Sequence, residues 1–353
     1  MGAVRCENRG NIYMSKHTIS DLYQMQSLPL SAKIRMTELR IKAWVDEYGE
    51  DGVYVSFSGG KDSTVLLDIV RKLYPDVKAA FVDTGLEYPE IREFVKTFDN
   101  VDWLKPKMNF KQVIEIYGYP FISKEVSECV DQAKKGLESS EGYYSYRLAK
   151  LLGTALDKNG NKSAYNQKKW AFLLKSPFKI SNQCCNVMKK RPVKDYAKLT
   201  GRKPITAQMA SESRLRTQKW LKNGCNGFEM KSPISNPMSF WMEQDVLLYI
   251  KKNNLKIASV YGEVVYSDDD GMYYEEPIFA ESMTLKTTGC QRTGCMFCGY
   301  GCHLEKSPNR FELMKQTHPK QYDYIMRPKE EGGLNYKEVI DWINENGNLD
   351  IKY

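Results

Sequence analysis

The sequence lacks any run of apolar residues long enough to cross a membrane, since a span needs about 20 of them, and its mean hydropathy is −0.55. The first residues, MGAVRCENRGNIYMSKH, contain no apolar core of a secretory signal. No internal repeat or low-complexity tract is present. We therefore expect a cytoplasmic protein with no membrane contact.

Disorder is excluded as well, because 42% of the 353 residues are hydrophobic and such a chain can build a core. The length predicts roughly two domain-sized units. Acidic residues are the minority, 44 against 52 Lys and Arg, which gives a net charge of +8. The isoelectric point near 8.8 suits anionic ligands. Dedicated nucleic-acid-binding domains typically have a higher isoelectric point, above about 9.

The cysteines are few but clustered. Cys6, Cys129 and Cys225 stand alone, and we expect no special role for them. The other six form a doublet and a short knuckle: Cys184, Cys185, Cys290, Cys295, Cys298 and Cys302. In a reducing compartment such clusters more often hold metal than disulfides.

Hydrophobic periodicity predicts a strand, loop and helix repeated twice after an N-terminal helical region. Such alternation implies right-handed crossovers, so the expected fold class is α/β, a Rossmann-like parallel sheet with helices on both faces. The predicted elements are helices over 18–48, a strand over 52–57, a helix over 65–74, a strand over 77–83 and a helix over 89–98.

Three parts of the chain are predicted. An N-terminal helical extension covers 1–48, and a nucleotide-binding α/β domain covers 49–232, with a polar insertion at about 133–175. A cysteine-rich subdomain covers 233–353. Further elements are expected as a strand over 203–207 and helices over 243–252 and 337–345.

A glycine-rich loop lies between the first predicted strand and its helix. Two glycines let the backbone approach phosphate oxygens, and the N-terminus of the helix attracts anions. A lysine adds charge and the hydroxyls add donors. The residues expected to hold phosphate are Ser58, Gly59, Gly60, Lys61, Asp62, Ser63 and Thr64. The segment SGGKDST resembles the pyrophosphate loop of the PP-loop superfamily of adenine-nucleotide enzymes.

Four further segments resemble one branch of that superfamily, the phosphoadenosine phosphosulfate reductase-like family, over residues 18–330. They are FVDTGLEYPE (81–90), YGYPFISKEVS (117–127), SPFKISNQCCNVMKKRPV (176–193) and ITAQMASESRLRTQKW (205–220). The resemblance implies that Asp83, Thr84 and Gly85 line the adenine nucleotide. It also implies that Arg214 and Arg216 grip the anion, with solvated helix residues as the alternative. Lys124 is expected either to contact phosphate or sulfate or to be an exposed helix-end lysine.

The same resemblance implies a [4Fe–4S] cluster held by Cys184, Cys185, Cys295 and Cys298, with Lys189 against the cluster and the substrate. The knuckle departs from the family pattern, because it has four cysteines rather than two. Cys290 or Cys302 is therefore an alternative ligand, and a local zinc site built from the four knuckle thiolates is the alternative metal.

Membership does not determine the reaction. The favoured interpretation is an ATP-using enzyme with Mg²⁺ that adenylylates a nucleic-acid or small-molecule acceptor and transfers sulfur to it. Lys61, Asp62, Lys189 and Arg214 are its expected catalytic residues. A sulfur-donor protein is the expected partner, either a cysteine desulfurase or a thioredoxin-like reductant.

Two alternatives to this interpretation stay open. The first is a sulfonucleotide reductase that releases sulfite. Reductases of this family carry a nucleophilic cysteine in an ECGLH-like motif near the end of the chain. Here residues 303–353 contain no cysteine, and Cys302-His303-Leu304 resembles that motif only weakly. The second is a non-catalytic nucleotide- or cluster-sensing partner in a modification or defence system.

Overall fold

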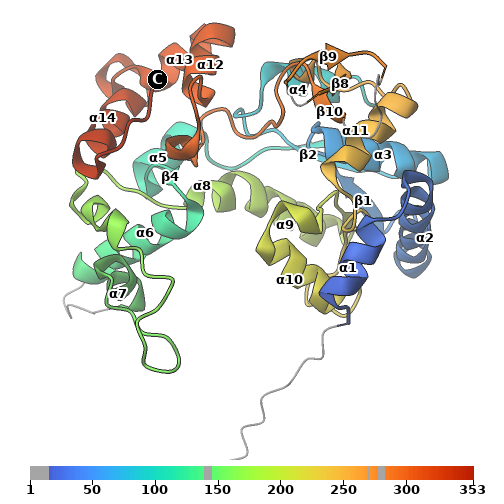
Figure 1. The fold of residues 1–353 in the computed structure, drawn as a ribbon, viewed down its shortest axis with the longest axis horizontal. Coiled ribbons are helices and arrows are strands. Elements are labelled where there is room, and N and C mark those ends of the chain that lie inside the picture. The colour runs from blue at the N-terminus through green and yellow to red at the C-terminus, as the bar shows by residue number, and fades with distance from the viewer. Residues whose placement is uncertain (1–15, 139–144, 269, 277–282) are drawn as a thin grey trace, which may run out of the picture. The chain divides into compact units, whose positions relative to one another are not determined.

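A mostly parallel six-stranded sheet with strand order β3-β2-β1-β5-β7-β6 organises the first part of the structure (Figure 1). The computed structural model describes residues 16–138, 145–268, 270–276 and 283–353. β1 (Val53–Ser56) pairs in parallel with β2 (Ala79–Val82) and with β5 (Lys203–Ile205). The predicted α/β fold with a parallel sheet is confirmed, and β6 is antiparallel to β7.

The remaining strands are shorter. They are β3 (Val101–Leu104), β4 (Phe121–Ile122), β6 (Asn226–Gly227), β7 (Ile234–Ser235), β8 (Val264–Ser267), β9 (Tyr273–Tyr274), β10 (Thr284–Thr287) and β11 (Gly299–Tyr300). Strands β10, β8 and β9 form a small antiparallel sheet, and β4 and β11 form a parallel pair.

The α-helices of the structure include every region predicted as helical, 18–48, 65–74, 89–98, 243–252 and 337–345, and others that the sequence did not predict. In chain order they are α1 (Ile19–Gln26), α2 (Leu30–Tyr48), α3 (Lys61–Leu73), α4 (Pro89–Lys96), α5 (Phe110–Tyr117), α6 (Lys124–Glu138), α7 (Tyr146–Leu152), α8 (Gln183–Cys185), α9 (Arg191–Thr200), α10 (Arg214–Asn223), α11 (Glu243–Lys252), α12 (Arg310–Thr317), α13 (Pro319–Met326) and α14 (Tyr336–Gly347). A π-helical turn, η2 (Asn186–Lys190), follows α8. Short 3₁₀ turns are η1 (Lys168–Lys175), η3 (Ala210–Glu212), η4 (Ser259–Tyr261), η5 (Cys302–Leu304) and η6 (Lys329–Glu331).

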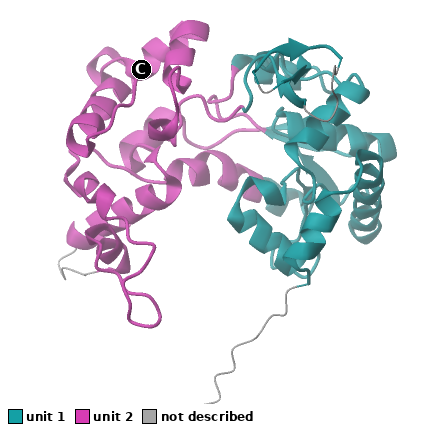
Figure 2. Ribbon diagram, in the orientation of Figure 1, with its two compact units in different colours: residues 1–81, 89–103, 196–292 teal, residues 82–88, 104–195, 293–353 magenta. Residues whose placement is uncertain are grey.

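The chain folds into two compact units built from interleaved segments (Figure 2). Unit 1 comprises residues 1–81, 89–103 and 196–292, and unit 2 comprises 82–88, 104–195 and 293–353. The predicted boundaries at 48 and 232 both fall inside unit 1. A contiguous division could not describe this arrangement, because the chain leaves unit 1 after β2 and returns to it more than once.

Burial on both sides of the β1 backbone explains why unit 1 forms around this strand. Val53, Tyr54 and Val55 are fully buried, as expected of a central parallel strand covered by helices. Helices α2 and α3 both pack against β1. The predicted strand and its following helix are therefore confirmed.

Unit 2 has its own hydrophobic core, which includes Phe121, Val130, Phe311, Tyr336 and Ile340. Tyr336 on α14 is fully buried, and its hydroxyl donates to the Phe297 carbonyl at 2.6 Å. The predicted insertion at 133–175 contains the end of α6, α7 and η1, and its residues 139–144 lie outside the described part. In the described part of the chain, no helix is both long and apolar enough to span a bilayer.

Candidate nucleotide and cysteine sites

The glycine-rich loop connects β1 directly to α3 in unit 1. Gly60 is the N-cap of α3, and Gly59 has φ +71°. A Cβ on Gly59 would lie 2.8 Å from both Ile91 Cγ2 and Val95 Cγ2 of α4. Only glycine therefore fits this position. Anion binding at the N-terminus of α3 stays a prediction.

The hydroxyls of the loop hold its shape. Ser63 Oγ lies 3.0 Å from Ser58 Oγ and donates to the Gly60 carbonyl at 3.0 Å. Thr64 Oγ1 donates to the same carbonyl at 2.9 Å. Contact of these hydroxyls with phosphate stays a prediction, but the bonds show that the loop is pre-organised.

Lys61 is held in a buried setting at the start of α3, with its side chain 5% exposed. Its Nζ donates to the Gln291 carbonyl at 2.8 Å and lies 3.4 Å from Glu243 Oε1. The ammonium also lies 5.5 Å from the centroid of the Tyr261 ring. These contacts fix the position of the ammonium, and its contact with an anion stays a prediction.

Asp62 is the centre of a charged group that also contains Lys61, Arg216, Glu243 and Arg292. Burial raises the pKa of Asp62, and the charge of Glu243 adds to the rise while the three cations oppose it. Glu243 begins α11 and lies 3.7 Å from Arg292 Nη2. Burial lowers the pKa of Arg216, which the charge of Asp62 partly restores.

The sequence predicted Lys61, Asp62 and Arg216 but missed Glu243 and Arg292. Glu243 starts a correctly predicted helix, but nothing in its local sequence indicated which loop that helix would meet. The second predicted arginine, Arg214, is exposed at the start of α10. Arg216 pairs with Glu212 on the preceding turn, and its charge acts on Asp62. It follows β5, the neighbour of β1 in the sheet.

The predicted nucleotide segment after β2 belongs to unit 2. Glu87 accepts bonds there from Thr84 N at 3.0 Å and Thr84 Oγ1 at 2.8 Å. Asp83 Oδ1 accepts from Gly85 N at 3.3 Å. Glu87 also lies 3.6 Å from Lys189 Nζ. Glu87, which the sequence did not single out, therefore links this turn to Lys189.

Lys189 lines a largely apolar pocket of unit 2 together with the thiols of four cysteines. These are the predicted ligands Cys184, Cys185, Cys295 and Cys298, and the remaining walls come from Leu86, Phe110, Pro120, Met188 and Phe297. Cys184 and Cys185 lie on α8, with their sulfurs 4.0 Å apart.

The loop that carries Cys295 and Cys298 is anchored by three backbone contacts. Met296 N donates to the Leu86 carbonyl at 2.8 Å, and Arg310 Nη1 donates to the Cys298 carbonyl at 2.7 Å. The third contact is the bond from Tyr336 to Phe297. The two cysteine segments, far apart in sequence, thus meet at one pocket within unit 2.

The charges around these thiols are mixed. The bond from Cys184 lowers the pKa of Cys185, and Lys124 and Lys189 act in the same direction. Burial raises the pKa of Cys295 to about 11, although Lys189 opposes the rise. Burial disfavours the charged form of Lys189, but Cys295 and Glu87 outweigh it and raise the pKa of Lys189.

The alternative ligands do not share this pocket. Cys290 belongs to unit 1, where its N–H donates to the Val260 carbonyl at 2.9 Å. Cys302 is 1% exposed, and its thiol donates to the Gly299 carbonyl at 3.0 Å. Among the described residues, no three or more His, Cys, Asp or Glu side chains converge as ligands of a single metal ion.

Comparison with known proteins shows the family to which the chain belongs. Residues 52–135 and 137–300 match the model of the phosphoadenosine phosphosulfate reductase domain. An uncharacterized protein of Methanocaldococcus jannaschii is 34% identical over 136 residues, which are 37% of this chain and 31% of that protein. An adenosine 5'-phosphosulfate reductase of Staphylococcus epidermidis is 26% identical over 224 residues, 63% of this chain and 70% of that enzyme.

A crystal structure of a phosphoadenylyl-sulfate reductase from Candida auris, in complex with phosphate, is similar with a TM-score of 0.36 and 14% identity. It covers 69% of this chain and 90% of that one. The family that the sequence motifs predicted is confirmed by the family-model match over residues 52–135 and 137–300. The chain belongs to the phosphoadenosine phosphosulfate reductase domain family.

Proposed function

We propose that the chain uses ATP with Mg²⁺ to adenylylate an acceptor, with release of pyrophosphate, in the course of sulfur transfer. The observation that carries this proposal is the charged group at the phosphate loop, where Glu243 lies 3.4 Å from Lys61 Nζ and its charge acts on Asp62. Three cations, Lys61, Arg216 and Arg292, share that position.

A pair of carboxylates suits Mg²⁺, which proteins usually hold through one or two carboxylates together with substrate phosphates. Asp62 and Glu243 would hold the ion here. Bound Mg²⁺ would neutralise charge on the phosphates and orient them. A sulfonucleotide has a single phosphosulfate and makes no such demand for a divalent ion, so the pair favours ATP.

The chain's own groups would serve the leaving group. The N–H groups of α3 and the buried ammonium of Lys61 would bind the pyrophosphate. An acceptor oxygen would attack the α-phosphorus, and the bond from that phosphorus to the pyrophosphate oxygen would break. Arg216 would neutralise the negative charge that develops during this step. The acceptor is then joined to AMP, a good leaving group for a sulfur nucleophile from a donor protein.

A [4Fe–4S] cluster takes four cysteine ligands, and four cysteines line the unit 2 pocket. They line one largely apolar pocket, and a lysine lines it with them. In this proposal Cys184, Cys185, Cys295 and Cys298 hold the cluster, which would bind and activate sulfur. Lys189 and Lys124 would balance the negative charge of the thiolates.

The reductase alternative needs an accessible thiolate as nucleophile. Cys302 is 1% exposed, and burial raises its pKa to about 12. A cysteine in this setting is protonated at neutral pH and out of reach of a substrate. This observation counts against Cys302 in that role and supports the ATP proposal.

The proposal is tested by thermal shift on anaerobically prepared protein with ATP, adenosine 5'-phosphosulfate or phosphoadenosine phosphosulfate, each with and without Mg²⁺. A ligand at about 100 times its Kd stabilises by about 2.7 kcal/mol, which raises Tm by several degrees. We expect Mg²⁺-dependent stabilisation by ATP, which Glu243→Gln removes and the exposed control Glu263→Gln retains. Stabilisation by a sulfonucleotide alone, indifferent to Mg²⁺ and to Glu243, would refute the proposal.

A further inference from the structure

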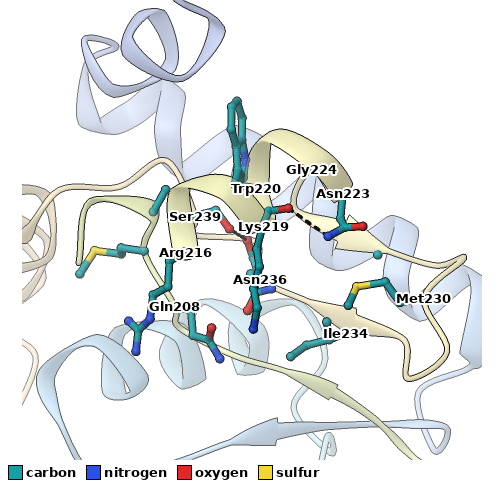
Figure 3. A pocket seen from close by; sticks show the side chains of 13 residues that line it. Gln208, Arg216, Lys219, Trp220, Asn223, Gly224, Met230, Ile234, Asn236 and Ser239 are labelled. Carbon is teal, nitrogen blue, oxygen red and sulfur yellow. Dashed lines mark hydrogen bonds between the residues drawn. The ribbon is translucent and has the colours of Figure 1, made fainter. Parts of the chain in front are cut away.

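A pocket within unit 1 lies at the carboxyl ends of β5 and β7, beneath α10 (Figure 3). The pocket is small and open to solvent, with a cavity volume of about 60 Å³. Its apolar wall includes Met209, Trp220, Met230 and Ile234. Trp220 is buried and stacks on His17, with ring centroids 4.6 Å apart, so this wall is rigid.

Three amide side chains line the same pocket. In the described part of the chain, the amide of Gln208 makes no hydrogen bond. Asn223 uses its Nδ2 to donate to the Lys219 carbonyl at 3.0 Å, and Asn236 accepts a bond from Thr206 through Oδ1. Asn223 Oδ1 and Asn236 Nδ2 are therefore available to bond a ligand. Amides offer both donors and acceptors, the combination that recognises the edge of a nucleobase.

The rim of the pocket is basic. Arg216 and Lys219 project from α10 toward Gln208 and Asn236 (Figure 3). An adjoining hollow of about 420 Å³ shares Asn223, Gly227 and Met230 with the pocket. The charged residues that line this hollow are Lys16, Lys222, Lys231 and the single acid Glu229. A polyanion lying along both hollows would meet mainly positive charge.

One residue links the pocket to the charged group at the phosphate loop. Arg216 lines the pocket, and its charge acts on Asp62 at the start of α3. In the sheet, β5 and β7 lie on one side of β1 and β2 lies on the other. A ligand in the pocket would thus lie on the same sheet as the loop predicted to hold pyrophosphate, with Arg216 lining its site.

We propose that this pocket and its basic rim bind a single-stranded nucleic acid, with one unpaired base in the pocket and the phosphate backbone along the lysines. The inference rests on the proposed function, because it names a nucleic-acid strand as the acceptor. A paired base could not enter the pocket, since its recognition edge is occupied in a duplex.

The test is fluorescence anisotropy of the full chain with labelled DNA or RNA of about 20 nucleotides, single-stranded and duplex, from about 50 to 200 mM KCl. Each phosphate contact on a single strand contributes about 0.7 to the salt slope, or about fivefold in affinity at ~0.1 M salt. Lys219→Gln/Lys231→Gln should therefore raise Kd about 25-fold and reduce the slope by about 1.4. The matched control is Lys252→Gln, an exposed lysine of α11.

A second variant tests the base pocket itself. Gln208→Leu should raise Kd about fivefold or more while leaving the salt slope unchanged, because it removes a base contact and no charge. Tight binding to the duplex, equal binding by wild type and the lysine variant, or full displacement of the strand by inorganic phosphate would each overturn the inference. Stabilisation by Mg-ATP is measured on the same samples. Its persistence alongside lost strand binding refutes only this inference, whereas its absence refutes the proposed function.

Discussion

Gly59→Ala tests whether the phosphate loop packs on α4 as described. The alanine would have to adopt φ +71°, which costs an L-residue about 1–2 kcal/mol. Its Cβ would also lie 2.8 Å from two methyl carbons, Ile91 Cγ2 and Val95 Cγ2. Overpacking of this kind costs typically about 1–3 kcal/mol. We expect the free energy of unfolding of unit 1 to fall by about 2–5 kcal/mol, measured by urea denaturation.

Gly201→Ala, also in unit 1, separates the two contributions. Gly201 has φ +73°, but nothing lies within 4 Å of its added Cβ. This variant should lose only the backbone part, about 1–2 kcal/mol. The difference between the variants then measures the contact with α4. Equal losses in both variants would show that the loop does not pack against Ile91 and Val95, and the pre-organised phosphate site would have to be abandoned.

Four other substitutions test the remaining features. Lys61→Met should abolish the several-degree rise in Tm with Mg-ATP, because the buried ammonium is lost; an unchanged rise would exclude Lys61 from the site. Cys295→Ala should remove bound iron and visible absorbance while Cys129→Ala retains both, and full iron content in the first variant would exclude Cys295 as a ligand. Cys302→Ala should keep iron and nucleotide binding but lower Tm, since a buried thiol is lost; lost iron would make it a ligand. Burial lowers the pKa of His303. The free energy of unfolding should therefore decrease as pH falls below about 6.5, because the unfolded chain binds the proton more readily. A His303→Phe variant with the same pH profile would contradict this.

Local patterns predicted the elements that position the phosphate site. The strand over 52–57 and its helix correspond to β1 and α3, and the helix over 243–252 corresponds to α11. These predictions succeeded because a buried strand, a glycine turn and an amphipathic helix are each encoded within about ten residues. The position of Glu243 beside Lys61 depends on packing between segments that are 182 residues apart. No periodicity carries that information.

The domain boundaries depend on long-range packing in the same way. The chain crosses between the two units several times, and each crossing follows from which hydrophobic surfaces meet, not from a change in composition. The cysteine knuckle shows the consequence. Cys290 and Cys295 are only five residues apart, yet they belong to different units. The spacing of the four knuckle cysteines suited a local metal site equally well, so spacing alone could not distinguish the alternatives.

The central claim is that the phosphate loop serves ATP with Mg²⁺. Equilibrium competition on anaerobically prepared protein tests it most directly, with radiolabelled ATP displaced by unlabelled ATP, adenosine 5'-phosphosulfate or phosphoadenosine phosphosulfate. The carboxylates Asp62 and Glu243 beside Lys61 predict that ATP binds only with Mg²⁺ and that neither sulfonucleotide displaces it at equal concentration. Displacement by a sulfonucleotide at concentrations below that of ATP, with or without Mg²⁺, would contradict the account.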